Sequence, residues 1–215
     1  MNGRTLPSAA RAGAPLSEAK AAVVLLHGRG GSAEDMLSLA DALDRPGLAW
    51  IAPRAPGRTW YPLSFLAPLG QNEPALSQAL GLVDAMVRGL AADGIAPERI
   101  VLAGFSQGGC LALEYAARHA RRYGGLVGLS ASLIGPEGTP RDYPGDLAGT
   151  PAFLGCSDVD AHIPLKRVEE SAEVLHRLGG AVTKRIYPGM GHTINQDEVA
   201  AMHAMLAALA PAIAG

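Results

Sequence analysis

The chain has 215 residues, a formal net charge of −2 at pH 7 and 48% hydrophobic residues. This length suffices for a substantial core, and the balanced charge favours neither disorder nor a polyanion-binding surface, so nucleic acid is not an expected partner. Every apolar run is interrupted well before ~18 residues and only two cysteines, Cys110 and Cys156, are present, so we expect no membrane span and no disulfide framework.

Residues 1–20 contain Ala, Pro and Gly with little pattern, and they are expected to form an irregular lead-in with at most an edge strand. This segment lacks the continuous apolar stretch of a secretory signal, which together with the cysteine count predicts a cytoplasmic protein. Residues 21–215 are expected to form a single domain. A homodimer is compatible with the sequence, which does not decide the oligomeric state.

From residue 21 onward, apolar runs alternate with segments of helical periodicity. The apolar runs predict strands at 21–26, 48–52, 100–104, 126–130, 152–156 and 182–187. Helices are predicted after Ser32, over 76–90, after Ser106, over 165–178 and after Asn195, where Asn195 and Glu198 form a capping pair. Strands that are apolar throughout and alternate with helices indicate an α/β fold, with a mostly parallel central sheet and helices on both faces.

The strand near 100–104 ends in Gly104-Phe105-Ser106-Gln107-Gly108, and a helical pattern follows at once. A Gly-x-Ser-x-Gly turn between a strand and a helix is typical of a nucleophile elbow, in which the serine is held at the end of the strand. The turn is too tight for bulky side chains at the two glycines. Ser106 is therefore the candidate nucleophile.

A serine hydroxyl needs a base and the base needs an orienting acid, which in this architecture follow the serine in the order acid, then histidine. His192 lies in a glycine-flanked loop directly after the last strand, whereas three of the other downstream histidines fall within predicted helices. Asp158 and Asp160 both follow the strand at 152–156. We predict His192 as the base and Asp160 as the acid, with Asp158 accepting hydrogen bonds from backbone amides.

An acyl-transfer site also needs two donors for the oxyanion. The backbone amides of Gln107, next to the serine, and of Arg29, in the glycine-rich loop after the first strand, are the expected donors. His27 is expected to pack and form hydrogen bonds rather than to move protons. No metal site or cofactor is predicted, since His162 beside Asp160 is only weak support for a metal site.

The irregular segment 54–72 is unusually long for a compact domain, and such loops are more often functional than not. Its aromatic residues favour the wall of an apolar substrate cleft, although they could also simply cover the core. The cleft candidates are Trp60, Tyr61 and Phe65.

From about Ala21 onward the chain resembles the phospholipase/carboxylesterase group of α/β hydrolases, which includes the acyl-protein thioesterases. The resemblance rests on four segments: His27–Gly31, Gly104–Gly109, Asp158–Pro164 and Gly189–His192. It implies the α/β-hydrolase fold, and the triad and oxyanion residues that it implies are those reached above. It further implies hydrolysis of carboxylic esters or thioesters through an acyl-serine, without metal or cofactor.

Two positions depart from many members of that group. Arg29 stands where many of them have leucine, which places a cation beside the cleft and leaves the acyl and leaving-group preferences open. Ala161 stands where many have proline directly after the acid, a change expected to affect only loop stiffness.

The sequence therefore predicts a serine hydrolase for esters or thioesters of small to medium acyl substrates. Two alternatives remain open: a hydrolase of the same fold acting on a lactone, a peptide or a lysophospholipid, and a non-catalytic α/β binding module. Retention of nucleophile, acid, base and oxyanion loop disfavours the second.

Overall fold

The computed structural model describes residues 7–43 and 46–213 of the chain. Its strands are β1 (Ala9–Gly13), β2 (Ala21–Leu26), β3 (Leu48–Pro53), β4 (Ile100–Phe105), β5 (Gly125–Leu129), β6 (Pro151–Ser157) and β7 (Ala181–Tyr187). Its α-helices are α1 (Ala33–Leu43), α2 (Ala75–Ala92), α3 (Gln107–Arg118), α4 (Leu165–Arg177) and α5 (Gln196–Ile213). Short 3-10 helices cover Pro56–Arg58, Leu69–Asn72 and Pro97–Arg99. The strands and helices predicted from the apolar runs are all present, with ends shifted by one or two residues.

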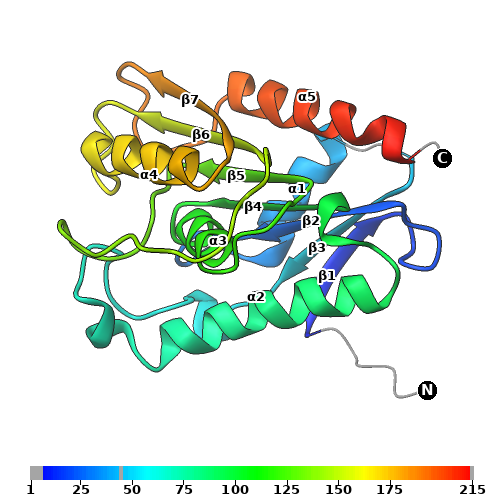
Figure 1. The fold of residues 1–215 in the computed structure, drawn as a ribbon, viewed down its shortest axis with the longest axis horizontal. Coiled ribbons are helices and arrows are strands. Elements are labelled where there is room, and N and C mark those ends of the chain that lie inside the picture. The colour runs from blue at the N-terminus through cyan, green and yellow to red at the C-terminus, as the bar shows by residue number, and fades with distance from the viewer. Residues whose placement is uncertain (1–6, 44–45, 214–215) are drawn as a thin grey trace.

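The strands form one seven-stranded sheet in the order β1-β3-β2-β4-β5-β6-β7 (Figure 1). Strands β2 to β7 are parallel to their neighbours, and only β1 runs antiparallel, against β3. The prediction of a mostly parallel sheet is confirmed. The edge strand that the sequence allows in the lead-in is present at residues 9–13, whose backbone pairs with β3; residues 1–6 of that lead-in lie outside the described residues.

Alternate residues of each central strand enter two separate apolar clusters, because successive side chains of a strand point to opposite faces. Val24 and Leu26 of β2 pack with α2, α3 and α4, whereas Val23 and Leu25 pack with α1 and α5. Figure 1 shows the same division, with α2, α3 and α4 on one side of the sheet and α1 and α5 on the other. All six residues of β2 are buried, as expected for a parallel strand covered on both faces.

The strand order reverses at β2, which pairs with β3 on one side and with β4 on the other. In open α/β sheets a crevice forms beyond the carboxyl ends of the strands at such a switch point, and ligands bind there. Leu26 and Gly104 pair across β2 and β4. The register therefore brings the glycine-rich loop after β2 next to Ser106, which follows β4.

None of the helices in the described ranges is long and apolar enough to cross a membrane. Cys110 and Cys156 are both buried free thiols. Within residues 7–43 and 46–213, no group of three or more His, Cys, Asp or Glu side chains is placed to hold a metal ion.

Candidate active site

Ser106 stands at the sharp turn between β4 and α3, with φ 53° and ψ −122°. A serine rarely adopts a positive φ, and such strain is typical of a nucleophile held at a strand-to-helix turn. The turn leaves no room for larger residues beside it. A Cβ on Gly104 would lie 2.5 Å from the Gly108 carbonyl carbon, and a Cβ on Gly108 would collide with the Leu26 backbone. The two glycines are therefore required by the close approach of β2, β4 and α3.

The three predicted triad residues lie in a continuous hydrogen-bonded line. The Oγ of Ser106 is 2.8 Å from Nε2 of His192, and Nδ1 of the same imidazole is 2.7 Å from Oδ2 of Asp160. Since a carboxylate only accepts, Nδ1 carries the proton and Nε2 is left to accept the serine hydroxyl proton. The arrangement can withdraw a proton from Ser106 as its oxygen attacks a carbonyl carbon.

The Asp160 side chain is fully buried, yet it has enough hydrogen-bond donors to remain charged. Burial acts to raise the pKa of Asp160, but the hydrogen bonds from His192 and from the backbone amides of His162 and Ile163 outweigh it and lower that pKa below its ordinary value. Asp160 is therefore ionised at neutral pH and can stabilise a protonated imidazole.

Asp158 accepts a hydrogen bond of 2.8 Å from the backbone amide of Gly189, in the loop that precedes His192. The Oγ of Ser157 accepts from the amide of Gly191 in the same loop, at 3.1 Å. Asp158 therefore accepts from a backbone amide as predicted, although the amide belongs to the histidine loop rather than to its own turn. Both contacts fix the backbone that carries His192.

The backbone amides of Arg29 and Gln107 have no acceptor within the described residues. By contrast, the amide of Gly30 donates to the carbonyl of Arg58 and the amide of Gly31 to that of Gly28. Gln107 is the first residue of α3, where helix amides lack intrahelical partners. One free backbone donor is therefore available at each of the two predicted oxyanion positions, and both residues line the pocket that contains Ser106.

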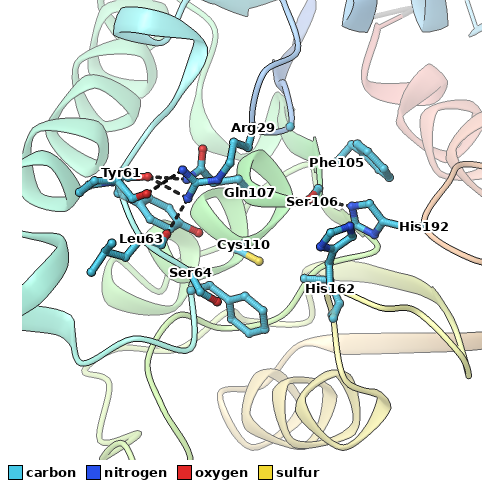
Figure 2. A pocket seen from close by; sticks show the side chains of 14 residues that line it. Arg29, Tyr61, Leu63, Ser64, Phe105, Ser106, Gln107, Cys110, His162 and His192 are labelled. Carbon is cyan, nitrogen blue, oxygen red and sulfur yellow. Dashed lines mark hydrogen bonds between the residues drawn. The ribbon is translucent and has the colours of Figure 1, made fainter.

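The side chains of the same two residues hold the long loop over the site. The Gln107 amide group donates to the Tyr61 carbonyl at 2.7 Å and accepts from the Trp60 amide at 3.0 Å. The Arg29 guanidinium donates to the carbonyl oxygens of residues 61, 62 and 63 at 3.0, 2.8 and 2.6 Å. Figure 2 shows Arg29 and Gln107 beside Tyr61 and Leu63 of the loop, with their hydrogen bonds as dashed lines.

A pocket of about 560 Å³ opens at Ser106, within the usual range for small-molecule sites. Tyr61 and Phe65 lie on its wall. The prediction for Trp60 is wrong: this side chain is 3% exposed, its Nε1 donates to the His27 carbonyl at 2.8 Å and its ring lies 4.9 Å from the His27 ring. Trp60 packs under the loop because the indole N–H finds its partner there.

Several pocket residues were not predicted as site residues from the sequence. They are Gly28, Pro62, Leu63, Ser64, Phe105, Cys110, His162 and Ile163. The rings of Phe105, at the end of β4, and of His162, in the loop after β6, lie 4.8 and 4.7 Å from the His192 ring. Their positions one residue before Ser106 and two residues after Asp160 in the sequence were the available signal.

Two other residues near the site, His27 and Cys110, carry side chains that could take part in catalysis elsewhere, but their surroundings hold them in structural roles. His27 donates from Nδ1 to the Gly28 carbonyl and accepts at Nε2 from the Ala55 amide, so both ring nitrogens are engaged by the backbone. Burial raises the pKa of the Cys110 thiol to about 12, so this residue on the pocket wall stays neutral.

The family model for phospholipase/carboxylesterase matches residues 9–210. The crystal structure of a phospholipase/carboxylesterase from Dyadobacter fermentans is 44% identical, with a TM-score of 0.89 and coverage of 95% of this chain and 100% of that one. Acyl-protein thioesterase 1 of Gibberella zeae is 29% identical over 88% of this chain and 91% of its own. The structure of esterase PE8 is 28% identical, with a TM-score of 0.78 and coverage of 94% and 98%.

Proposed function

The chain belongs to the phospholipase/carboxylesterase family, and from this premise we propose that Ser106, His192 and Asp160 are its catalytic triad. The protein is a serine hydrolase that acts on carboxylic esters or thioesters. The observation that carries the assignment of residues is the unbroken pair of hydrogen bonds from Ser106 through His192 to Asp160.

In the proposed mechanism, Oγ of Ser106 attacks the carbonyl carbon of the ester while Nε2 of His192 takes the hydroxyl proton. The negative oxygen of the tetrahedral intermediate accepts hydrogen bonds from the Arg29 and Gln107 backbone amides. The imidazolium, stabilised by Asp160, gives its proton to the departing alcohol or thiol and leaves an acyl-serine. Water, deprotonated by His192, then releases the acid and restores the serine.

We further propose that the substrates have small to medium acyl groups. The pocket is open to solvent on one side and has Phe65, Phe105 and Ile163 on its wall, which suits a short apolar chain. Leu63 and Val159 are the large hydrophobic side chains that stand exposed in the described part of the chain, at 44% and 61%. Leu63 lines the pocket and adds exposed apolar surface to its wall. The cytoplasmic location stays a prediction from the sequence.

The proposal is tested by measuring hydrolysis of 4-nitrophenyl esters from acetate to palmitate, together with labelling by a fluorophosphonate probe. We expect turnover to be greatest with short to medium chains and to fall by roughly 10⁴-fold or more in Ser106→Ala and in His192→Ala. The double variant should lose no more than either single variant, because the residues act as a unit. Multiplicative losses would count against the triad, and a wild-type protein that neither turns over nor labels would support a binding module.

A further inference from the structure

The wall of the active-site pocket is basic or neutral throughout. Its ionisable side chains are Arg29, Tyr61, Cys110, His162 and His192, and within the described residues it includes no aspartate or glutamate. Burial raises the pKa values of Tyr61 and Cys110, so both are neutral at pH 7. Asp160, the carboxylate of the proposed triad, is buried behind His192 and does not line the pocket. At neutral pH the fixed charge of the wall is the guanidinium of Arg29.

This guanidinium is held in place without a counter-charge. Its three hydrogen bonds go to the carbonyls of residues 61–63, and within the described residues no carboxylate lies within 4 Å of it. Other arginines of the chain are paired differently: Arg54 contacts Glu34, Arg118 contacts Glu114 and Arg185 contacts Asp197. The positive charge of Arg29 is therefore available to an anionic group of a ligand that enters the pocket.

The Arg29 guanidinium also keeps N–H groups that are free to donate hydrogen bonds to a ligand. A guanidinium has five N–H groups, and three of those of Arg29 are engaged by the loop. The carbonyls fix the long side chain, so little rotamer entropy is lost when a ligand binds. The free donors are Nε–H and one Nη1–H, which point in different directions because both Nη2 hydrogens are engaged, so a carboxylate accepts a single charge-assisted hydrogen bond from this fixed cation. Figure 2 shows Arg29 on the side of the pocket away from His162 and His192.

We propose that Arg29 is a specificity-determining residue that selects esters bearing a carboxylate. Its guanidinium binds that carboxylate while Ser106 attacks the ester carbonyl, an inference that rests on the proposed serine hydrolase mechanism. The carboxylate can belong to the acyl group, as in a half-ester of a dicarboxylic acid, or to the leaving group. Because Arg29 is exposed to solvent, the selectivity should be roughly tenfold in kcat/KM rather than several orders of magnitude.

The test compares matched esters in wild type, Arg29→Lys and Arg29→Met. For the acyl side, the pair is mono-4-nitrophenyl adipate and its methyl ester; for the leaving group, it is 3-carboxy-4-nitrophenyl butyrate and 4-nitrophenyl butyrate. Ser106→Ala supplies the blank for spontaneous hydrolysis. The readout is the ratio of kcat/KM for the charged ester to that for the neutral ester, because both Arg29 variants lose contacts to the loop and their absolute rates will fall.

We expect the ratio on one of the two arms to fall about tenfold in Arg29→Met and to be largely retained in Arg29→Lys, which keeps the charge. Adding 0.5 M NaCl should lower the wild-type ratio and leave that of Arg29→Met nearly unchanged, since salt screens an exposed cation. The arm that responds identifies where the carboxylate lies. Equal ratios in all three proteins on both arms would overturn the inference, while the absence of wild-type turnover on all four esters would instead refute the proposed function.

Discussion

At the scale of single residues, the two carboxylates after β6 show how positions two apart in the sequence acquire different tasks. Asp160 faces His192 Nδ1 and is fully buried, whereas Asp158 accepts the amide of Gly189 at an exposed site. The first contact sets the tautomer of the imidazole, and the second fixes the backbone that carries it. Only the contact of Asp160 joins a carboxylate directly to the imidazole, so it is the contact that strengthens when the imidazole becomes charged.

Replacement of each carboxylate by its amide separates these tasks. Asp160→Asn should lower kcat by roughly 10³–10⁴-fold, because an amide does not stabilise the imidazolium and permits the wrong tautomer. Asp158→Asn keeps an oxygen for the Gly189 amide and should cost less than about tenfold. Steady-state kinetics on a 4-nitrophenyl ester, with circular dichroism as a check on folding, decides the order. A larger loss in Asp158→Asn would mean that the acid has been assigned to the wrong residue.

At the scale of elements, the turn between β7 and α5 contains an unusual capping pair. Asn195 Oδ1 accepts the Glu198 amide and Glu198 Oε2 accepts the Asn195 amide, both at 2.9 Å, which confirms the predicted cap. Glu198 is nevertheless buried against Gly155 of β6, and its Oε1 has no hydrogen-bond partner within the described residues. Burial raises the pKa of Glu198 to about 7, against an ordinary value of 4.5.

The raised pKa makes stability depend on pH with a definite sign. Between pH 4.5 and about 7 the folded state binds the proton of Glu198 and the unfolded state does not, so stability falls as pH rises through this window and then levels off. The full effect is at most about 3 kcal/mol. Glu198→Gln keeps an acceptor for the Asn195 amide and cannot ionise.

Urea denaturation at pH 5, 6, 7 and 8 measures the free energy of unfolding for wild type, Glu198→Gln and Glu173→Gln. The difference between Glu198→Gln and wild type should grow in favour of the variant from pH 5 to pH 7 and then stay constant. Glu173 is exposed on α4 and serves as a control for loss of a surface charge. A difference that does not vary with pH would rule out titration of Glu198 in this range.

Which of these features could be predicted from the sequence depends on how local their causes are. The apolar strands, the Asn195 cap and the turn at Ser106 are set by residues within one or two turns of chain, and all were predicted. Trp60 was misassigned because its indole partner, the His27 carbonyl, is 33 residues away in the sequence. The Arg29 side chain was placed beside the cleft, but its three acceptors are contributed by a loop 32–34 residues away.

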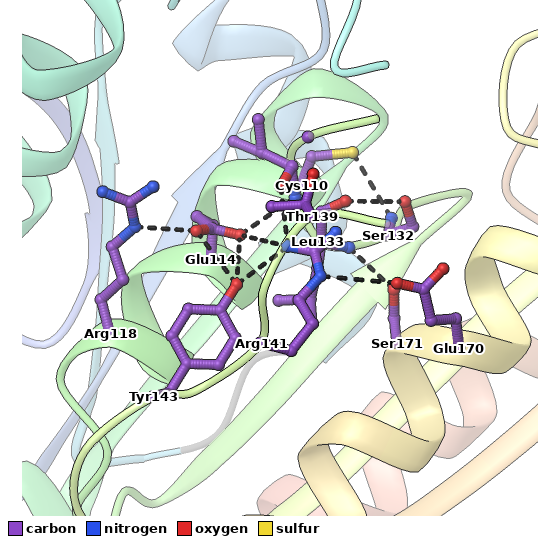
Figure 3. A network of polar contacts seen from close by, with 12 residues as sticks. Cys110, Glu114, Arg118, Ser132, Leu133, Thr139, Arg141, Tyr143, Glu170 and Ser171 are labelled. Carbon is purple, nitrogen blue, oxygen red and sulfur yellow. Dashed lines mark hydrogen bonds and ion pairs between the residues drawn. The ribbon is translucent and has the colours of Figure 1, made fainter. Parts of the chain in front are cut away.

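At the scale of the whole molecule, a buried polar network joins α3, α4 and the connection between β5 and β6 (Figure 3). Glu114 of α3 is 1% exposed and accepts from Arg118, from Tyr143 and from the Ile134 amide, with Arg141 at 3.6 Å. Arg141 also contacts Glu170 of α4. The next amide along, that of Gly135, donates to the carbonyl of Phe65 at 2.7 Å. The network therefore extends from the core to the loop that forms the pocket wall.

Removing the charge at the centre of this network should affect both stability and substrate binding. Glu114→Gln leaves Arg141, whose side chain is 7% exposed, with a single carboxylate contact, to Glu170 at 3.5 Å, and the cost should be about 3 kcal/mol. For a chain of this size the corresponding fall in Tm is roughly 10 °C. A looser connection at Gly135 also frees the Phe65 wall, so KM should rise more than kcat falls.

The matched control is Arg118→Gln, which removes one donor from the same carboxylate at a site that is 34% exposed, where water can replace it. Its cost should stay below about 1 kcal/mol, with KM unchanged. Calorimetry and 4-nitrophenyl butyrate kinetics on both variants distinguish a buried counter-charge from one hydrogen bond among many. Equal and small effects would show that Arg141 is adequately compensated by Glu170, and a fall in Tm with no change in KM would show that the network supports the core but not the pocket wall.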